Sequence, residues 1–149
     1  MLSAREVADY FLALVDDEAG DSLSNLKLQK LVYYAQGFRL ALVGLPLFDD
    51  PIEAWEHGPV VPSLYHAFKQ HRAESIPRPE DGIDLERYPP EVKELLDEVY
   101  SVFGQFSATK LRNMTHSEPP WREAYGRCPS SIISHESMAE FFKTQVVNG

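Results

Sequence analysis

Apolar residues recur along this chain at intervals of three and four positions, the spacing that places side chains on one face of an α-helix. A capping-box pattern formed by Ser3 and Glu6 precedes the first such stripe and predicts where a helix begins. Similar stripes return in three later parts of the chain, so the pattern predicts a mainly α fold. The four stripes contain Val7, Tyr10, Phe11 and Leu14; Leu64, Tyr65 and Phe68; Val92, Leu95, Leu96, Val99 and Phe103; and Met138, Phe141 and Phe142.

The segment LKLQKLVYYAQGFRLAL differs from these stripes, because apolar side chains lie nearly all round the helix that it predicts. Ser24 is a suitable N-cap, and Gly44 and Pro46 supply stop signals after Val43. Such a helix leaves little surface for water. We therefore expect a central buried helix with the other elements packed around it.

Polar side chains nevertheless recur on this helix. They form two strips, Gln29, Tyr33 and Gln36 on one side and Lys27, Lys30 and Tyr34 on the neighbouring side. A buried amide without a hydrogen-bond partner costs about 1 to 3 kcal/mol, so either internal backbone groups or a binding partner must satisfy the glutamines. The sequence leaves both alternatives open. The two lysines fit either a contact site or a solvated helix face, and we expect reversal of their charges to leave the fold intact.

Turn and cap residues divide the remainder of the chain. Residues 46–60 predict a short β-hairpin or an extended segment, with His57-Gly58-Pro59 as the turn. Residues 72–90 are polar and rich in proline, which predicts an exposed loop. Further helix starts are expected at Ser63, Pro90, Ser107 and Ser134, and a turn containing Trp121 at Pro119 or Pro120.

Together these elements predict a single compact domain over residues 1–149, with about six or seven helices around the central one. A chain of 149 residues, 44% of them hydrophobic, is long enough to bury its own core. Cys128 is the only cysteine, which excludes an internal disulfide and fits a reducing compartment. No apolar run reaches membrane-spanning length and the first residues lack an export signal, so we expect a cytoplasmic protein without membrane contact.

The charge balance restricts the partners of the chain. Its 14 Lys and Arg residues and 23 Asp and Glu residues give a net charge of -9. Affinity for nucleic acid depends on Lys and Arg releasing counterions from phosphates, so this balance argues against direct nucleic-acid binding. The same charge suits a basic protein partner, because it accelerates encounter in a way that weakens as salt rises.

Motifs for familiar chemistry are absent from the sequence. There is no HExxH motif or CxxC pair for a metal and no GxxxxGK or GxGxxG loop for a nucleotide, so we expect no cofactor and no metal. Cys128 has no partner that sequence can place and is interpreted as an incidental thiol. His116 follows Thr115 at a predicted helix end, where either residue fits backbone hydrogen bonding and the imidazole also fits acid-base chemistry. Trp55 and Trp121 fit contact anchors and core packing equally.

Three separated motifs resemble the Panacea domain, the family of SocA-like antitoxins that includes GepA-like phage-associated proteins. They are LSNLKLQKLVYYAQGFRLALVGLPLFDDPIEAWEHGPVVPSLYHAF, FSATKLRNMTHSEPPWREAY and IISHESMAEFF. The likeness extends from about Leu2 to Phe142 and departs from the family pattern at Val32, at Phe38 and in the loop 72–90. The matching residues are Leu26, Lys27, Gln29, Lys30, Leu31, Tyr34, Gln36, Trp55, Gly58, Pro59, Val60, Tyr65, Thr115, His116 and Trp121.

This resemblance implies a mostly helical domain that neutralises a toxin from a neighbouring gene by direct protein binding, without catalysis. One family member presents its toxin to the ClpXP protease, so the implied partners are a cognate protein toxin and, for a proteolytic adaptor, ClpXP; a homo-oligomer is also compatible with the sequence. The candidate residues for partner binding or for shaping the site are Lys27, Gln29, Lys30, Tyr33, Tyr34, Gln36, Trp55, His57, Gly58, Pro59, Tyr65, Thr115, His116 and Trp121.

Two other functions stay open at this point. One is a small enzyme in which His116 and His57 perform acid-base chemistry. The other is a phage-associated structural or assembly protein, which would self-associate and have no toxic neighbour. An antitoxin differs from both because a flanking gene is toxic alone and harmless when the two are coexpressed.

Overall fold

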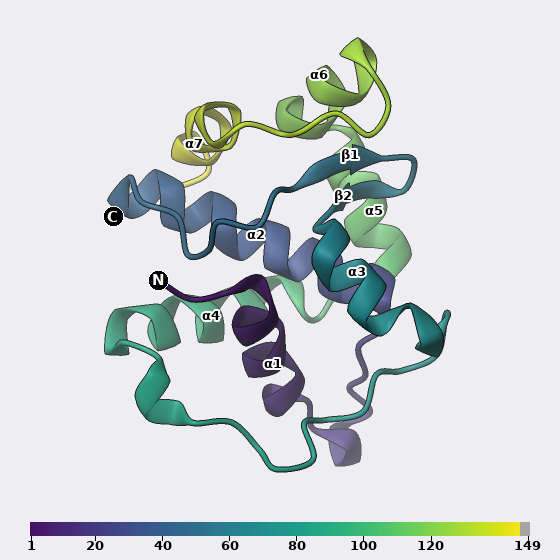
Figure 1. The fold of residues 1–149 in the computed structure, drawn as a ribbon, viewed down its shortest axis with the longest axis vertical. Helices are drawn as coiled ribbons and strands as arrows, with labels where there is room; N and C mark the ends of the chain where they lie inside the picture. Colours follow the sequence, from purple (N-terminus) through teal and green to yellow (C-terminus); the bar gives the residue numbers. More distant parts are fainter. Residues whose placement is uncertain (147–149) are drawn as a thin grey trace.

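In the computed structural model, which describes residues 1–146, helices surround the long central helix α2 (Asn25–Val43) (Figure 1). Seven α-helices and a two-stranded sheet occur in this part of the chain, which confirms the mainly α prediction. None of these helices is long and apolar enough to cross a membrane. The other elements are α1 (Ala4–Leu14), η1 (Asp17–Ala19), β1 (Glu53–Trp55), β2 (Gly58–Val60), α3 (Pro62–Phe68), η2 (Lys69–His71), η3 (Leu85–Arg87), α4 (Pro90–Phe103), α5 (Ala108–His116), α6 (Pro119–Arg127) and α7 (His135–Lys143), where η marks a 3₁₀ helix.

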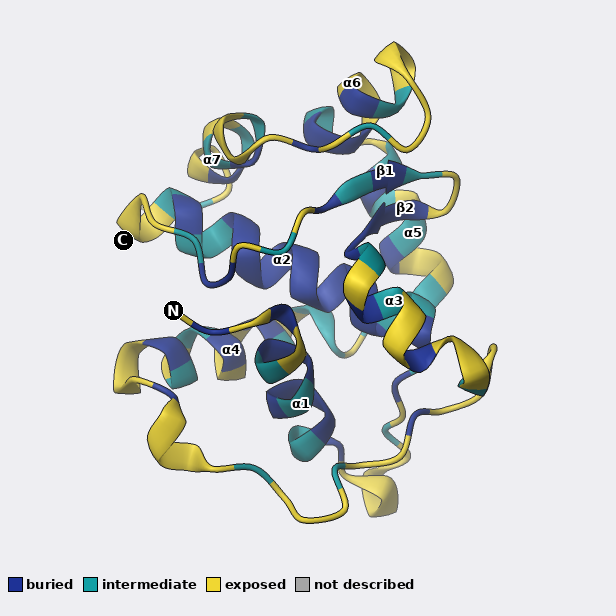
Figure 2. Cartoon of the chain, viewed as in Figure 1, coloured by how far each residue is buried: buried dark blue, intermediate teal, exposed yellow. Residues whose placement is uncertain are grey.

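Helix α2 is the centre of the core. It contacts α1, α3, α4, α5, α7 and β2, and 12 of its 19 residues are buried (Figure 2). The Ser24 side chain accepts a hydrogen bond from the backbone N–H of Lys27 at the start of the helix. Gly44 ends it with a left-handed φ of 81°. The predicted central helix between Ser24 and Gly44 is therefore confirmed, and contacts on several sides explain why its sequence is apolar nearly all round.

Gln36 ties α2 to the segment before the hairpin. Its Nε2 donates to the carbonyl of Phe48 at 2.8 Å, and its Oε1 accepts from the backbone N–H of Leu47 at 2.7 Å. The side chain is fully buried, so both ends of the amide are satisfied inside the protein. For Gln36, internal backbone groups are the partners.

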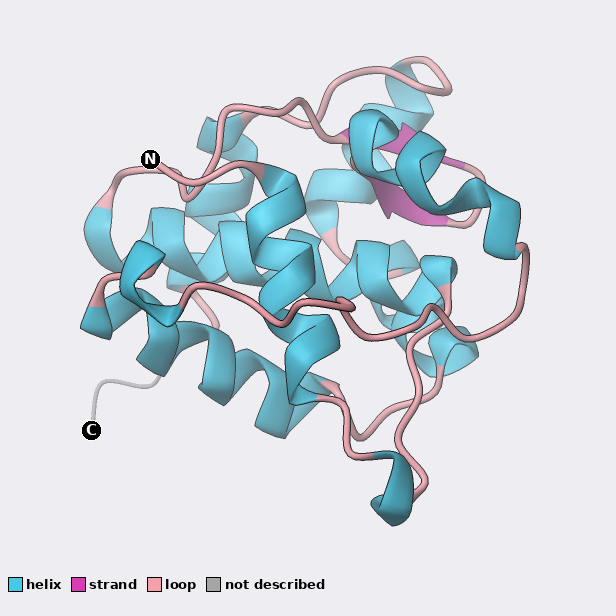
Figure 3. Ribbon diagram, turned by 60° about the horizontal axis from the view of Figure 1, so that its bottom comes forward, coloured by secondary structure: helices cyan, strands magenta, loops and turns pink. Residues whose placement is uncertain are grey.

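The expected hairpin is present, but its turn differs from the prediction. Strands β1 and β2, coloured magenta in Figure 3, pair in antiparallel fashion with Trp55 opposite Gly58. Glu56 and His57 make the turn between them. Gly58 and Pro59, which we expected in the turn, belong to β2. The turn is therefore two residues long, and both glycine and proline lie on the buried strand.

Most helix starts follow the local capping residues. The expected starts at Ser3, Pro90, Ser107 and Ser134 are confirmed. Helix α3 is the exception, because it begins at Pro62 with Val61 as its N-cap. Ser63, the expected cap, instead donates a hydrogen bond to Oδ2 of Asp50 at 2.8 Å. A contact thirteen positions away thus takes the hydroxyl that the local pattern assigned to capping.

Two further segments differ from expectation. Pro119 occupies the first turn of α6, so Trp121 lies on a helix and not in a turn. The loop 72–90 is exposed over most of its length, but Ile76 and Tyr88 are buried. These two side chains anchor the loop to the hydrophobic core.

Candidate functional site

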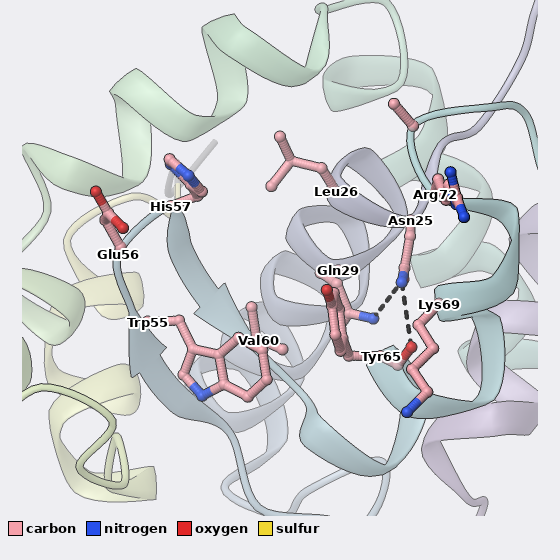
Figure 4. A pocket seen from close by; sticks show the side chains of 11 residues that line it. Asn25, Leu26, Gln29, Trp55, Glu56, His57, Val60, Tyr65, Lys69 and Arg72 are labelled. Carbon is pink, nitrogen blue, oxygen red and sulfur yellow. Dashed lines mark hydrogen bonds between the residues drawn. The ribbon is translucent and has the colours of Figure 1, made fainter.

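A cleft of about 420 Å³ opens where the N-terminal end of α2 meets the hairpin and α3 (Figure 4). Several parts of the chain that are distant in sequence line it, so tertiary packing fixes its shape. Helix α2 supplies Asn25, Leu26 and Gln29, the hairpin supplies Trp55, Glu56, His57 and Val60, and α3 with the segment after it supplies Tyr65, Lys69, Arg72 and Ala73.

A chain of hydrogen bonds holds the floor of the cleft. Nδ2 of Asn25 donates to the carbonyl of Tyr65 at 3.2 Å, and Oδ1 of Asn25 accepts from Nε2 of Gln29 at 2.9 Å (Figure 4). Oε1 of Gln29 accepts from the backbone N–H of Val61 at 2.9 Å. These bonds join α2 to α3 and to the end of the hairpin. Gln29 is therefore satisfied internally, and its role is to fix the shape of the cleft.

Two aromatic rings form much of the apolar wall. The ring of Trp55 packs edge-on against Tyr65 with the ring centroids 5.0 Å apart. Nε1 of Trp55 donates to Oε1 of Glu53 at 2.9 Å, which fixes the orientation of the indole. Trp55 and Tyr65 are each half-buried. Trp55 thus packs on one side against the protein and presents the remainder of its ring to the cleft.

The rim of the cleft is basic although the protein as a whole is acidic. Lys69 and Arg72 are exposed after α3, and His57 is exposed on the hairpin turn, with Glu56 as the acidic lining residue (Figure 4). No ion pair within residues 1–146 involves Lys69 or Arg72. These cations are free to pair with a carboxylate of a bound molecule.

Lys30 lies behind the hairpin and not at the surface. Its side chain is 0% exposed, and its Nζ donates to the carbonyl of Pro59 at 3.2 Å. Burial lowers the pKa of Lys30 to about 7, and the nearby positive charge of Arg112 acts in the same direction. The expectation that Lys30 tolerates charge reversal is therefore wrong, because a carboxylate there would be buried beside a carbonyl oxygen.

Gly58 allows the hairpin to approach Lys30 closely. Its φ is 115°, and a Cβ at this position would lie 2.5 Å from Cε of Lys30 and 2.9 Å from Oγ1 of Thr115. Thr115 is fully buried, and its hydroxyl donates to the carbonyl of Arg112 at 2.8 Å. For Thr115, the backbone hydrogen-bonding interpretation is confirmed.

His116 and Trp121 support β1. Their rings stack with centroids 3.9 Å apart and 5° between the ring planes, and Nε1 of Trp121 donates to the carbonyl of Trp55 at 2.7 Å. Nε2 of His116 is buried and has no hydrogen-bond partner within the described residues. Burial lowers the pKa of His116, and the charge of Arg112 lowers it further, which favours the neutral ring. Trp121 is itself buried, so core packing accounts for it.

His57 contacts a cation and not an acid. Its Nδ1 accepts a hydrogen bond from Nε of Arg112 at 3.0 Å, which requires that nitrogen to be unprotonated. Within residues 1–146, neither His57 nor His116 hydrogen-bonds to a carboxylate. A general-base histidine is usually oriented by an acceptor on its other ring nitrogen. No carboxylate therefore orients either histidine, and a hydrogen bond between His116 and the backbone of Glu56 is the interaction that raises the pKa of the ring against the effect of burial.

The other candidate residues of α2 do not line the cleft. Nζ of Lys27 donates to the carbonyl of Gly104 at 2.6 Å and so caps the C-terminal end of α4. The hydroxyl of Tyr34 donates to Oε2 of Glu118 at 2.8 Å, and burial raises the pKa of that carboxyl to about 7. Tyr33 is fully buried, and its hydroxyl has no partner within the described residues. Lys27, Tyr33 and Tyr34 thus serve the packing of α2.

Four polar or charged residues of the cleft, Asn25, Glu56, Lys69 and Arg72, were not among the candidate site residues. Asn25 and Glu56 lie within the first motif but not among its matching residues, and Lys69 and Arg72 follow that motif. Asn25 directly follows the N-cap Ser24, which is a weak local sign of a polar role. The three charged residues lie on exposed segments, where the sequence does not distinguish a functional charged residue from a solvated one.

The fold and the cleft define a mainly α-helical protein with a preformed surface cleft, and no group of three His, Cys, Asp or Glu residues within the described part could hold a metal ion. The chain belongs to the family described as "Antitoxin SocA-like, Panacea domain", whose model matches residues 28–122.

A curated relative adds to this assignment. The chain is similar to Antitoxin SocA of Caulobacter vibrioides (strain NA1000 / CB15N), with 34% identity over 109 residues. The aligned region covers 66% of this chain and 58% of the relative, so the chain spans less than two thirds of that protein. No solved structure matches the chain.

Proposed function

We propose that this protein is an antitoxin that binds a toxin encoded by a neighbouring gene and neutralises it by direct contact. The observation that carries the proposal is that family-matching residues from separate motifs converge on one hairpin. Gln29 and Lys30 from α2 hold its second strand and the residue after it, and Trp121 from α6 holds Trp55. A domain that fixes a cleft in this way, and belongs to an antitoxin family, is suited to rigid docking.

The cleft would receive an apolar side chain of the toxin between Trp55 and Tyr65. Both rings already have fixed orientations, so little side-chain freedom is lost when the toxin binds. Lys69 and Arg72 at the rim would pair with a carboxylate next to that side chain. Tryptophan, tyrosine and arginine are the side chains that most often dominate binding energy in protein interfaces.

Long-range charge favours the same role. The net charge of -9 attracts a basic toxin, whereas the basic rim of the cleft selects an acidic segment within it. The two effects separate experimentally, because steering depends on total charge and falls with salt, while the rim contact depends on two side chains. Association rates measured at several salt concentrations report the first effect, and dissociation rates report the second.

The experiment that tests the proposal is coexpression with each flanking open reading frame. We expect one of these reading frames to stop growth when expressed alone and to be tolerated when this chain is present. The neutralised cells should contain a complex of the two proteins that copurifies. A control replaces this chain with Gly58→Asp, whose side chain would clash with Lys30 and Thr115 in the native hairpin. If neither flanking product is toxic, the proposal fails.

A finer form of the proposal is that the chain is a proteolytic adaptor which delivers the bound toxin to ClpXP. Steric inhibition and delivery give different results in cells that lack ClpXP. An adaptor should lose protection in those cells, and the toxin should persist after synthesis is stopped. A steric inhibitor should protect equally well with and without the protease, and the toxin should be equally stable in both strains.

A further inference from the structure

A second surface lies at the opposite end of α2 from the cleft. Two adjoining hollows of about 340 Å³ and 470 Å³ run between the C-terminal part of α2 and helix α4, and Gln145 and Val146 after α7 also line the second of them. Both are lined by Leu42, Leu95 and Glu98, so they form one continuous groove. We call this the α2–α4 groove.

Apolar side chains form the bed of the α2–α4 groove. Leu42 is 56% exposed and Val102 is 40% exposed, which is high for side chains of this size. Phe38 and Leu95 line the same hollow and are half-buried. In Figure 2 the end of α2 and the turn after it are coloured as exposed. The end of the central helix thus leaves apolar surface in water, although the rest of that helix is largely covered.

The charges along the α2–α4 groove are mainly negative. Glu91, Glu94 and Glu98 lie three and four positions apart on α4, a spacing that puts them on one face of the helix, and all three are exposed. None of them takes part in an ion pair within residues 1–146. Arg39 lines the same hollow, and its Nε is buried without a hydrogen-bond partner in that part of the chain. An occupant must therefore match apolar surface flanked by unpaired carboxylates.

We propose that the α2–α4 groove binds an amphipathic helix of a partner protein, with apolar residues on one face and Lys or Arg residues beside that face. From Glu91 to Val102, helix α4 rises by about 16 Å, which corresponds to about three turns of an opposing helix. A helix fits a groove between two helices through apolar anchors at i, i+3 or i+4, and i+7. Basic residues flanking those anchors would pair with Glu94 and Glu98.

Charge favours such a helix over a second copy of the chain as the occupant of the groove. The net charge of -9 means that two copies repel one another at long range. The exposed apolar side chains and the row of glutamates occur together in one groove, and a basic amphipathic helix satisfies both. This inference does not rest on the proposed function, because it concerns a different surface and names the partner segment by its chemistry alone.

The test uses a synthetic probe and needs no toxin. The probe is a fluorescent peptide of about 15 leucine and lysine residues arranged with helical period, and its control has the same composition in an order that destroys the period. Binding is measured by fluorescence anisotropy with the full chain. We expect saturable one-to-one binding of the helical peptide and weaker binding of the control peptide.

Matched variants locate the binding site. Glu94→Lys with Glu98→Lys reverses two exposed charges in the groove, and Glu136→Lys with Glu140→Lys on α7 makes the same change at the same spacing elsewhere. We expect the groove variant to weaken peptide binding about tenfold or more and the α7 variant to change it less than about twofold.

A second pair of variants tests the apolar contact independently of charge. Leu42→Ser should weaken peptide binding about tenfold, whereas Ile132→Ser, at a site that is 59% exposed, should leave it unchanged. Thermal melts check that all variants stay folded. Equal effects of the groove variants and their controls would overturn the proposal, as would equal binding of the two peptides. A dimer that forms without peptide and dissociates in Leu42→Ser would also overturn it, because a second copy would then occupy the groove.

Discussion

Replacing Lys30 by methionine should make the free energy of unfolding less dependent on pH between about 7 and 9. In the folded protein, burial lowers the pKa of Lys30 from 10.5 to about 7, whereas unfolding restores the ordinary value. The unfolded chain therefore binds more protons than the folded chain in this pH range. Burial of the charged amine destabilises the protein fully at pH values below the pKa of Lys30 in the folded chain. This destabilisation disappears as the pH rises toward the pKa of Lys30 in the unfolded chain. Stability of the natural protein should thus increase with pH across the range.

A difference of one bound proton changes the free energy of unfolding by about 1 kcal/mol per pH unit. Over two units Lys30 should contribute about 2 kcal/mol of added stability, and Lys30→Met should lack this gain. Loss of the hydrogen bond to Pro59 shifts the variant by a nearly constant amount and leaves the slope unchanged. Burial also lowers the pKa of Lys27, but this residue is the same in both proteins and cancels in the comparison.

The assay is urea unfolding followed by tryptophan fluorescence at closely spaced pH values, with free energies extrapolated to water. Lys143→Met serves as the control, because Lys143 is exposed. The control should keep the slope of the natural protein, and only Lys30→Met should flatten it. Identical slopes for the natural protein and Lys30→Met would refute the reasoning, since the buried amine would then not be the group that titrates.

Three other substitutions test the packing of the hairpin and of the segment before it. Gly58→Ala should destabilise the fold by about 2 kcal/mol or more in chemical unfolding, because φ is 115° and a Cβ would meet neighbouring side chains. Gln36→Leu should cost about 2 to 5 kcal/mol by the same measurement, since the N–H of Leu47 and the carbonyl of Phe48 would be buried without partners. Trp55→Ala should lower the free energy of unfolding by less than about 3 kcal/mol, because the ring is half-buried. A larger decrease in stability, measured by thermal melting, would mean that the ring belongs to the core.

The elements whose signals are local could be predicted from sequence. Ser3, Ser107 and Ser134 cap helices through side-chain contacts three positions away, and such contacts depend little on the rest of the fold. The central position of α2 was also predictable, because a helix that is apolar nearly all round must be covered by other elements. Ser63 shows the limit of this reasoning, since Asp50 takes its hydroxyl.

The cleft could not be predicted, because its geometry depends on contacts between distant residues. The bond between Asn25 and the carbonyl of Tyr65 spans 40 positions, and that between Trp121 and the carbonyl of Trp55 spans 66. A helical projection places Lys30 on α2 but does not show that the hairpin covers it. For the same reason, the sequence does not show which family-matching residues build the scaffold and which face the cleft.

Binding of the toxin in the cleft beside the hairpin is tested by the dissociation constant between this chain and the toxic product of its neighbouring gene. Lys69→Glu with Arg72→Glu reverses the exposed rim charges, while Arg127→Glu with Lys143→Glu changes the net charge equally at other exposed sites. We predict that the rim variant weakens binding about tenfold or more and that the other variant stays within about twofold of the natural protein. Equal dissociation constants for the two variants would contradict the claim, because toxin binding would then depend on total charge or on another surface.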